Sequence, residues 1–233
     1  MGSIGSNLQE VKRRIDAACA ASGRNANTVT LLAVSKTFDG AAVREAHAAG
    51  QRAFGENYVQ EALAKIDGLA DLRASLEWHL IGPLQSNKTR PVAEAFDWVH
   101  TIDRLKLAER LAAQRPPGLP PLQLCLQVNI SGEASKSGLP PHEVAQVAAA
   151  VATLPRLRLR GLMSIPEPAQ GLQAQQAPHR ALRLLLQDLN QRGLALDTLS
   201  MGMSDDLEAA VAEGSTMVRV GTALFGARPP GAA

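Results

Sequence analysis

Apolar residues recur at helical spacing over residues 6–21, and Gly23 follows as a helix-ending residue, so the chain is expected to open with an amphipathic helix. Ser6 is the predicted cap of this helix, with Gln9 three residues further on. Short apolar runs then alternate with helical patterns. Eight runs predict strands at Thr28–Val34, Arg52–Phe54, Leu76–Ile81, Asp97–Thr101, Leu122–Ile130, Leu157–Ile165, Asp197–Met201 and Thr216–Val220. Seven helical patterns lie between them, at Gly40–Ala49, Asn57–Ile66, Ser86–Ala95, Arg104–Gln114, Pro140–Thr153, Ala174–Arg192 and Asp205–Glu213. Asp39, Asp103 and Ser204 each precede a helical pattern and are predicted helix caps.

This alternation predicts an α/β protein in which eight strands and their helices form one (β/α)8 TIM-type barrel, preceded by an extra N-terminal helix. A doubly wound sheet is the alternative, but no Gly-rich dinucleotide fingerprint follows the first predicted strand. The Pro/Gly-rich stretch at residues 115–121 is too short to separate two domains. We therefore expect a single domain over residues 1–233.

Composition narrows the function classes. Aromatic residues make up only 3% of the chain, which argues against stacking platforms for nucleic acid, and the net charge of +2 is spread along the sequence. No apolar stretch approaches the roughly 18 residues of a spanning helix, and no secretory signal precedes the first helix. Cys19 and Cys125 lie far apart in apolar surroundings, which fits neither a metal site nor a disulfide framework. These features favour a cytoplasmic protein without a nucleic-acid or membrane partner.

One lysine stands out from the six in the chain. In a barrel the active site lies at the carboxyl ends of the strands, and Lys36 directly follows the first buried strand. Partial desolvation there would lower its pKa and free the amine to attack a carbonyl. A lysine that extends from the rim toward solvent is an equally good interpretation of this residue alone. Of the other five, Lys136 lies in a Gly/Ser-rich loop and the rest lie on helices or helix starts.

The last two strands are followed by residues that suit a phosphate. Gly202 permits close approach of the backbone to a ligand, and Ser204 is the predicted start of a helix. Gly221 and Thr222 offer a second backbone pair with a hydroxyl after the eighth strand. The loops after strands seven and eight form the recurrent phosphate site of such barrels, whereas either loop alone would suggest ordinary turn glycines.

Arg219 interrupts an otherwise apolar strand. An unpaired buried arginine would cost several kcal/mol, so it must either pair with a carboxylate or face a ligand atom at the barrel mouth. A lysine nucleophile, a phosphate cup and an arginine for a ring nitrogen together describe pyridoxal 5′-phosphate (PLP) bound as a Schiff base.

Seven motifs then add a resemblance that extends from about residue 6 to residue 228: LLAVSKT, GENYVQE, WHLIGPLQSNK, QVNISGEASKSG, GLMSIP, SMGMSDD and VRVGTALFGAR. As a set they closely resemble the pyridoxal-phosphate homeostasis proteins, the YggS/PROSC family. The resemblance implies a barrel of the alanine racemase N-terminal type with the cofactor on Lys36 and Asn57 near it. It further implies that the phosphate is held by Ser200, Ser204, Gly221 and Thr222, and that Arg219 faces the pyridine nitrogen.

The resemblance implies a protein that holds PLP and other B6 vitamers for intracellular vitamin B6 homeostasis and supplies PLP-dependent apoenzymes. An arginine at the pyridine nitrogen disfavours the protonated ring and so weakens it as an electron sink. A PLP-dependent racemase is the alternative, although Tyr58 is the only tyrosine and a second base usually comes from a separate β domain. A third reading is a barrel enzyme with a different phosphorylated substrate. A monomer is expected. We expect no metal site and no enzymatic turnover.

For three further residues we expect structural roles. His79 is expected to be a hydrogen-bonded structural histidine, with a role in the pocket as the alternative. His100 is read as a surface or packing residue. Glu56 is read as a carboxylate at a helix start, where the helix dipole favours it.

Overall fold

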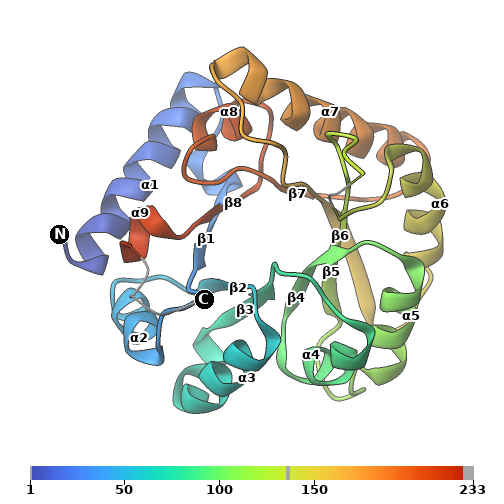
Figure 1. Ribbon diagram of the computed structural model, residues 1–233, viewed down its shortest axis with the longest axis horizontal. Coiled ribbons are helices and arrows are strands. Elements are labelled where there is room, and N and C mark those ends of the chain that lie inside the picture. Colours follow the sequence, from blue (N-terminus) through green and yellow to red (C-terminus); the bar gives the residue numbers. More distant parts are fainter. Residues whose placement is uncertain (1, 135–136, 228–233) are drawn as a thin grey trace.

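Eight parallel strands close into a barrel in their sequence order, so that β8 pairs with β1 (Figure 1). The computed structural model describes residues 2–134 and 137–227; Lys136 therefore lies outside the described residues. The strands are β1 Thr30–Val34, β2 Ala53–Glu56, β3 Glu77–Leu80, β4 Trp98–Ile102, β5 Leu122–Gln127, β6 Leu157–Met163, β7 Thr198–Ser200 and β8 Met217–Val220. The TIM-type barrel predicted from the alternating pattern is confirmed.

Helices surround the barrel on its outer face (Figure 1). They are α1 Ile4–Ala21, α2 Gly40–Ala48, α3 Val59–Gly68, α4 Thr89–Ala95, α5 Leu105–Gln114, α6 Pro141–Val151, α7 Leu172–Gln191, α8 Leu207–Ala212 and α9 Thr222–Phe225. The extra N-terminal helix is α1. The short helix α9, directly after β8, was not predicted. Within the described residues no helix combines the length and the apolar character that crossing a membrane would require.

The helix starts differ in part from the sequence predictions. Asp39 caps α2 as predicted, since its Oδ1 accepts from the backbone N–H of Ala42, the third residue of the helix. The cap of α1 is Ser3 rather than Ser6, because the Ser3 hydroxyl accepts from the Ser6 N–H at 3.2 Å. The caps predicted at Asp103 and Ser204 are wrong, because α5 and α8 begin later and the residue before each makes no side-chain cap hydrogen bond.

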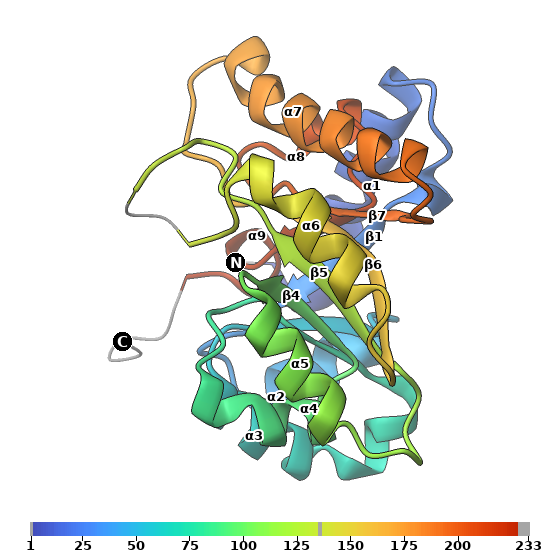
Figure 2. The ribbon, with the colours of Figure 1, turned by 90° about the vertical axis from the view of Figure 1, so that its right-hand side faces the viewer.

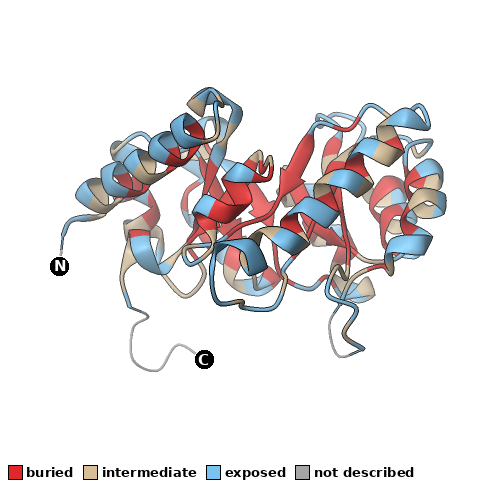
Figure 3. Ribbon diagram, turned by 90° about the horizontal axis from the view of Figure 1, so that it is seen from above, coloured by how far each residue is buried: buried red, intermediate tan, exposed pale blue. Residues whose placement is uncertain are grey.

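Two apolar regions hold the barrel together. The larger lies between the strands and the helices, where buried residues follow the outward faces of the strands and the inward faces of the helices (Figure 3). The smaller lies inside the barrel and consists of Leu32, Val34, Ala53, Ile81, Trp98, Cys125, Met163 and Met217. Burial raises the pKa of the Cys125 thiol to about 12, so it behaves there as a small apolar side chain.

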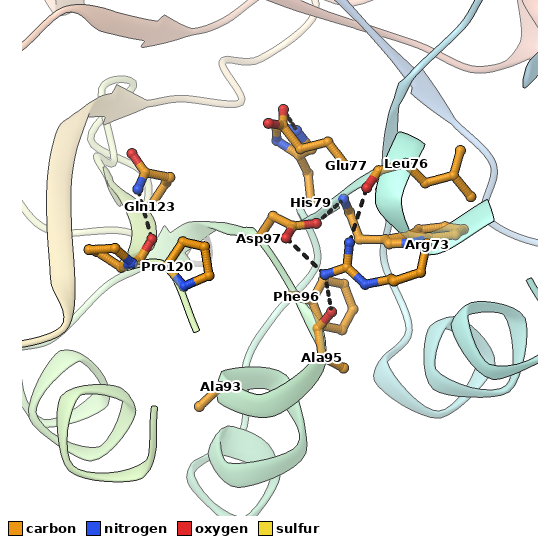
Figure 4. Close-up of polar contacts among 12 residues, drawn as sticks. Arg73, Leu76, Glu77, His79, Ala93, Ala95, Phe96, Asp97, Pro120 and Gln123 are labelled. Atoms are coloured by element: carbon orange, nitrogen blue, oxygen red, sulfur yellow. Dashed lines mark hydrogen bonds and ion pairs between the residues drawn. The ribbon is translucent and has the colours of Figure 1, made fainter. Parts of the chain in front are cut away.

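The two ends of the barrel differ in character. At the carboxyl end, the loops after β5 and β6 project from the molecule on the same side (Figure 2). At the amino end, Asp97 accepts from the Trp78 N–H at 2.8 Å and from the Arg73 guanidinium at 2.8 Å (Figure 4). These bonds tie the starts of β3 and β4 together.

Candidate functional site

A cavity of about 510 Å³ opens at the carboxyl ends of the strands. Six of the eight residues predicted from the sequence line it, and Ser200 and Gly202 are not among its lining residues. The lining residues are Val34, Lys36, Asn57, Ile81, Ile165, Met203, Ser204, Asp205, Arg219, Gly221 and Thr222. The cavity therefore brings together the ends of β1, β2, β3 and β8 and the loops after β6 and β7.

Lys36 lies in the short loop after β1, half-buried, and both of its chain neighbours are held by carboxylates. The Ser35 hydroxyl donates to Glu56 Oε1 at 2.5 Å, and the Thr37 N–H donates to Glu61 Oε1 at 2.7 Å. Thr37 has a φ of 68°, a left-handed conformation that residues other than glycine seldom adopt. The loop that carries Lys36 is thus fixed from two sides.

A second lysine joins these carboxylates. Lys65 Nζ, on α3, lies 2.6 Å from Glu56 Oε1 and 3.0 Å from Glu61 Oε1, and it donates to the Ser35 carbonyl at 2.8 Å. Its side chain is only 4% exposed and that of Glu56 is fully buried. We refer to Lys65, Glu56 and Glu61 with Ser35 and Thr37 as the Lys65 cluster.

The Lys65 cluster corrects one sequence interpretation and adds residues that were missed. Glu56 is the last residue of β2 rather than a helix-start carboxylate, because α3 begins only at Val59. Burial raises the pKa of Glu56, although the Lys65 ammonium beside it stabilises the carboxylate and so acts to lower that pKa. The sequence did contain a signal that Lys65 is buried. Lys65 falls at helical spacing with the buried Val59 and Ala62, on the apolar face of α3.

Asn57 offers the cavity an acceptor that the described residues leave unused. Its Oδ1 is buried and has no hydrogen-bond partner in the structure. The backbone of Asn57 lies so close to Gly82 that a Cβ on that glycine would come within 2.0 Å of the Asn57 carbonyl oxygen. This approach fixes the asparagine at the cavity wall. A buried acceptor without a partner is costly, so this atom suits a donor on a ligand.

Arg219 forms part of the cavity floor and is 4% exposed. Its Nη1 donates to Ser200 Oγ at 2.8 Å and its Nη2 donates to the Ser164 carbonyl at 2.9 Å. Both acceptors are neutral, so a carboxylate pair, the alternative weighed for this arginine, is not what holds it within the described residues. Burial lowers the pKa of Arg219 to about 10, which leaves it a cation at neutral pH.

The β8 side of the cavity begins at Gly221. A Cβ there would lie 3.3 Å from the Val34 carbonyl oxygen, so the end of β8 packs closely against the end of β1. Helix α9 begins at Thr222, and the first N–H groups of a helix have no acceptor inside it. Thr222 therefore brings a hydroxyl and free backbone donors to the cavity.

The β7–α8 loop forms the neighbouring wall. Gly202 has a φ of 96°, and a Cβ would meet that of Ala210 at 2.5 Å, so this turn requires glycine. Arg14 on α1 donates to the Ser204 carbonyl at 2.8 Å and pairs with Glu208, which ties the loop to the N-terminal helix. Asp205 also lines the cavity.

Fold and site together define a (β/α)8 barrel of the alanine racemase N-terminal class. Residues 6–229 match the family model described as alanine racemase, N-terminal domain. The chain is 64% identical over 232 residues to the pyridoxal phosphate homeostasis protein of Pseudomonas aeruginosa, covering 100% of this chain and 99% of that one. It is 56% identical to the protein of that name from Escherichia coli K12, covering 98% of each. The chain belongs to the pyridoxal phosphate homeostasis protein family, as its motifs predicted.

Solved structures support the same assignment. PipY of Synechococcus elongatus PCC7942 with PLP bound has a TM-score of 0.84 and 41% identity, and the match covers 96% of this chain and 100% of PipY. The alanine racemase of Corynebacterium glutamicum has a TM-score of 0.69 at 20% identity and shows the fold alone. That match covers 94% of this chain and 62% of the racemase.

Proposed function

We propose that this chain binds PLP in the cavity at the carboxyl end of the barrel, with the Lys36 amine joined to the cofactor as a Schiff base. The observation that carries the proposal is the placement of Lys36, Arg219 and Thr222 around one cavity of about 510 Å³. The PLP-bound structure of PipY, at 41% identity, supports the choice of cofactor.

The polar groups of the cavity match those of PLP. The cofactor brings an aldehyde that condenses with a lysine amine and releases water, a ring nitrogen, a ring hydroxyl and a phosphate. Asn57 Oδ1 is the unpartnered buried acceptor, which suits the hydroxyl. Arg219 supplies the donor for the ring nitrogen, and Ser204, Gly221 and Thr222 supply hydroxyl and backbone donors for the phosphate.

The structure offers a reason why Lys36, rather than Lys65, would react. Lys65 donates to two carboxylates and a carbonyl and is buried behind the loop, whereas Lys36 lines the cavity. The Lys65 cluster in turn holds Ser35 and Thr37, and so presents Lys36 at a fixed position. Preorganisation of this kind lowers the entropic cost of covalent capture.

Ser200 and Gly202 are proposed to support the binding of PLP indirectly, through other residues. The Ser200 hydroxyl is fully buried and is hydrogen-bonded to Arg219 and His100, so we assign it to Arg219 rather than to the phosphate. Gly202 shapes the turn before Ser204.

We further propose that the chain holds and supplies PLP for vitamin B6 homeostasis. An arginine against the ring nitrogen disfavours its protonation, so the ring is a weak electron sink for carbanion chemistry. Storage, together with delivery to apoenzymes in the cytoplasm, needs no such sink. The family name carried by the relatives at 64% and 56% identity supports this role. A monomer suffices for it, since every group named above comes from one chain.

The test is the visible absorption spectrum of the purified protein with PLP, before and after borohydride, followed by peptide mapping. We expect a yellow band that reduction abolishes, with the mass adduct on Lys36. Lys36→Ala should lose the band and keep the fold, whereas Lys106→Ala, an exposed lysine on α5, should keep both. A reduced adduct on another lysine in Lys36→Ala, or no uptake of PLP at all, would contradict the proposal. Turnover of amino-acid enantiomers would instead favour a racemase.

A further inference from the structure

A continuous row of hydrogen bonds crosses the inside of the barrel beneath the cavity. It starts at Arg219, whose Nη1 donates to Ser200 Oγ at 2.8 Å. Ser200 Oγ lies 2.7 Å from His100 Nδ1. His100 Nε2 lies 2.9 Å from His79 Nδ1, and His79 Nε2 lies 2.8 Å from Glu77 Oε1. We call these five residues the interior chain.

The interior chain connects two sides and two ends of the barrel. Arg219 and Ser200 belong to β8 and β7, whereas His100, His79 and Glu77 belong to β4 and β3. The two imidazoles and Ser200 are fully buried. Glu77 is the first residue of β3, at the amino end, and lies beside His79 (Figure 4). Its side chain is 49% exposed. The chain therefore links the cavity floor to solvent at the opposite mouth of the barrel.

Arg219 and Glu77, at the two ends of the interior chain, set the direction in which its hydrogen bonds are donated. An arginine side chain has only donors and a carboxylate has only acceptors. The Ser200 oxygen accepts from Arg219, so its own hydrogen has His100 Nδ1 as the acceptor. His100 must then donate from Nε2 to His79 Nδ1, and His79 must donate from Nε2 to Glu77. Both histidines are thus neutral, with their hydrogen on Nε2.

The opposite direction leaves a defect. If His79 carried a second proton and donated to His100, then His100 would donate to Ser200, whose oxygen already accepts from Arg219. The Ser200 hydrogen would be buried without an acceptor among the described residues, which is costly. Only the direction from Arg219 to Glu77 satisfies every group.

Electrostatics of the surroundings agree with this direction. Burial, with His79 and Arg219 nearby, lowers the pKa of His100 well below its ordinary value, which keeps it neutral. The hydrogen bond from His79 lowers the pKa of Glu77, which keeps it anionic. Trp98 and Arg160 also face Glu77, and Trp98 stacks on the His79 ring at 5.2 Å between centroids. The end members are therefore a cation and an anion, and the three members between them are neutral.

We propose that Glu77, His79, His100 and Ser200 are positioning residues that orient Arg219 toward the ring nitrogen of PLP and set its strength as a donor through the charge of Glu77. The inference rests on the proposed function, because it assigns the ring nitrogen to Arg219. Hydrogen bonds in such a row polarise one another, so a charge at the far end changes the donor at the near end. The affinity and colour of bound PLP thus depend on a carboxylate at the other mouth of the barrel.

Glu77→Gln tests the charge without removing the hydrogen bond, because the amide oxygen can still accept from His79. We expect the Kd for PLP to rise about three- to tenfold, since a charge-assisted bond is roughly twice as strong as a neutral one. The absorbance maximum of bound PLP should also shift, which a purely structural role would not cause. Asp71→Asn is the control: its carboxylate is 60% exposed, pairs with Arg44 and lies outside the interior chain. If Glu77→Gln matches Asp71→Asn in both readouts, the inference is wrong.

A second measurement tests the chain in the PLP-free protein. Long-range ¹H–¹⁵N spectra of the histidine rings should show His79 and His100 neutral, each with its hydrogen on Nε2. A hydrogen on Nδ1 of either ring, or a doubly protonated His79 at neutral pH, would overturn the inference. Failure of the proposed function looks different: wild-type protein would take up no PLP while the rings still showed these tautomers. In that case the interior chain would stand as a structural feature and its assignment to PLP would be wrong.

Discussion

The Lys65 cluster and the interior chain distribute charge in opposite ways. The Lys65 cluster lies beside the loop that carries Lys36, whereas the interior chain ends at Arg219 in the cavity. In the Lys65 cluster, the cation touches two carboxylates directly, at 2.6 and 3.0 Å. In the interior chain, the Arg219 cation and the Glu77 anion are separated by a hydroxyl and two neutral imidazoles. One lies beside the first strands and the other crosses the barrel.

This difference indicates two uses of a buried cation. The charge of Lys65 is balanced by the carboxylates that it contacts, and its bond to the Ser35 carbonyl helps to fix the loop around Lys36. Little of the charge of Lys65 is therefore left for a ligand. Among the described residues Arg219 donates to neutral oxygens, so its charge remains directed at the cavity. The first arrangement holds a nucleophile in place, and the second keeps a donor available.

The largest effect is expected from breaking the Lys65 cluster. Lys65→Met should reduce the free energy of unfolding by about 3–5 kcal/mol, because it leaves Glu56 buried without its cation. Urea unfolding monitored by circular dichroism measures this loss. The exposed Lys106 provides the control, since Lys106→Met should change stability by less than about 0.5 kcal/mol. A loss below about 1 kcal/mol for Lys65→Met would mean that the cluster does not hold the loop.

A smaller effect is expected from cutting the interior chain. Ser200→Ala removes the oxygen that accepts from Arg219 Nη1 and the hydroxyl that donates to His100 Nδ1. We therefore expect the free energy of unfolding to fall by about 1–3 kcal/mol and PLP binding to weaken. Ser164→Ala is a matched control beside the same guanidinium. The Ser164 hydroxyl is buried without a partner in the structure, and its carbonyl still accepts from Arg219 after the substitution. Equal losses of affinity in the two variants would deny Ser200 a specific role.

The comparison also shows which parts of the molecule the sequence could predict. All eight strands were expected, because each is a short apolar run between turns, and Lys36 and Arg219 stood out by their position within or after such runs. Strands β5 and β6 end earlier than predicted, since the apolar pattern continues into the loops at the barrel mouth. Helix α9 was missed, because four residues carry too little periodicity to be recognised.

The two buried networks could not be predicted in the same way, because they depend on how distant strands align. His79 and His100 come to lie 2.9 Å apart through the register of β3 with β4, and Ser200 joins them from across the barrel. A partial signal existed in β3 and β4, where polar residues occupy the alternate positions that point into the barrel. Those positions carried Glu77, His79 and His100 next to apolar Trp98 and Ile81, and polar residues inside a barrel need partners.

The smallest effect expected is a change in acid stability that separates the two networks. The pKa of His100 is lowered in the folded protein, so below its ordinary value of about 6.5 the unfolded chain binds a proton that the folded chain does not. Stability should therefore fall as the pH decreases from about 6.5, with this residue contributing up to about 1.4 kcal/mol per pH unit. His100→Gln should flatten the dependence between pH 6.5 and 5 by up to that amount.

Urea unfolding at several pH values measures that slope, and His142→Gln, an exposed histidine on α6, is the control that should leave it unchanged. Glu56 in the Lys65 cluster acts in the opposite direction, because its raised pKa makes the folded state bind a proton more tightly as the pH falls. As the pH falls, the interior chain is thus expected to contribute less to the free energy of unfolding. The Lys65 cluster is expected to contribute more, because its carboxylate becomes protonated. An unchanged slope in His100→Gln would show that the folded protein takes up a proton at His100 as readily as the unfolded chain, which the direction assigned to the interior chain does not allow.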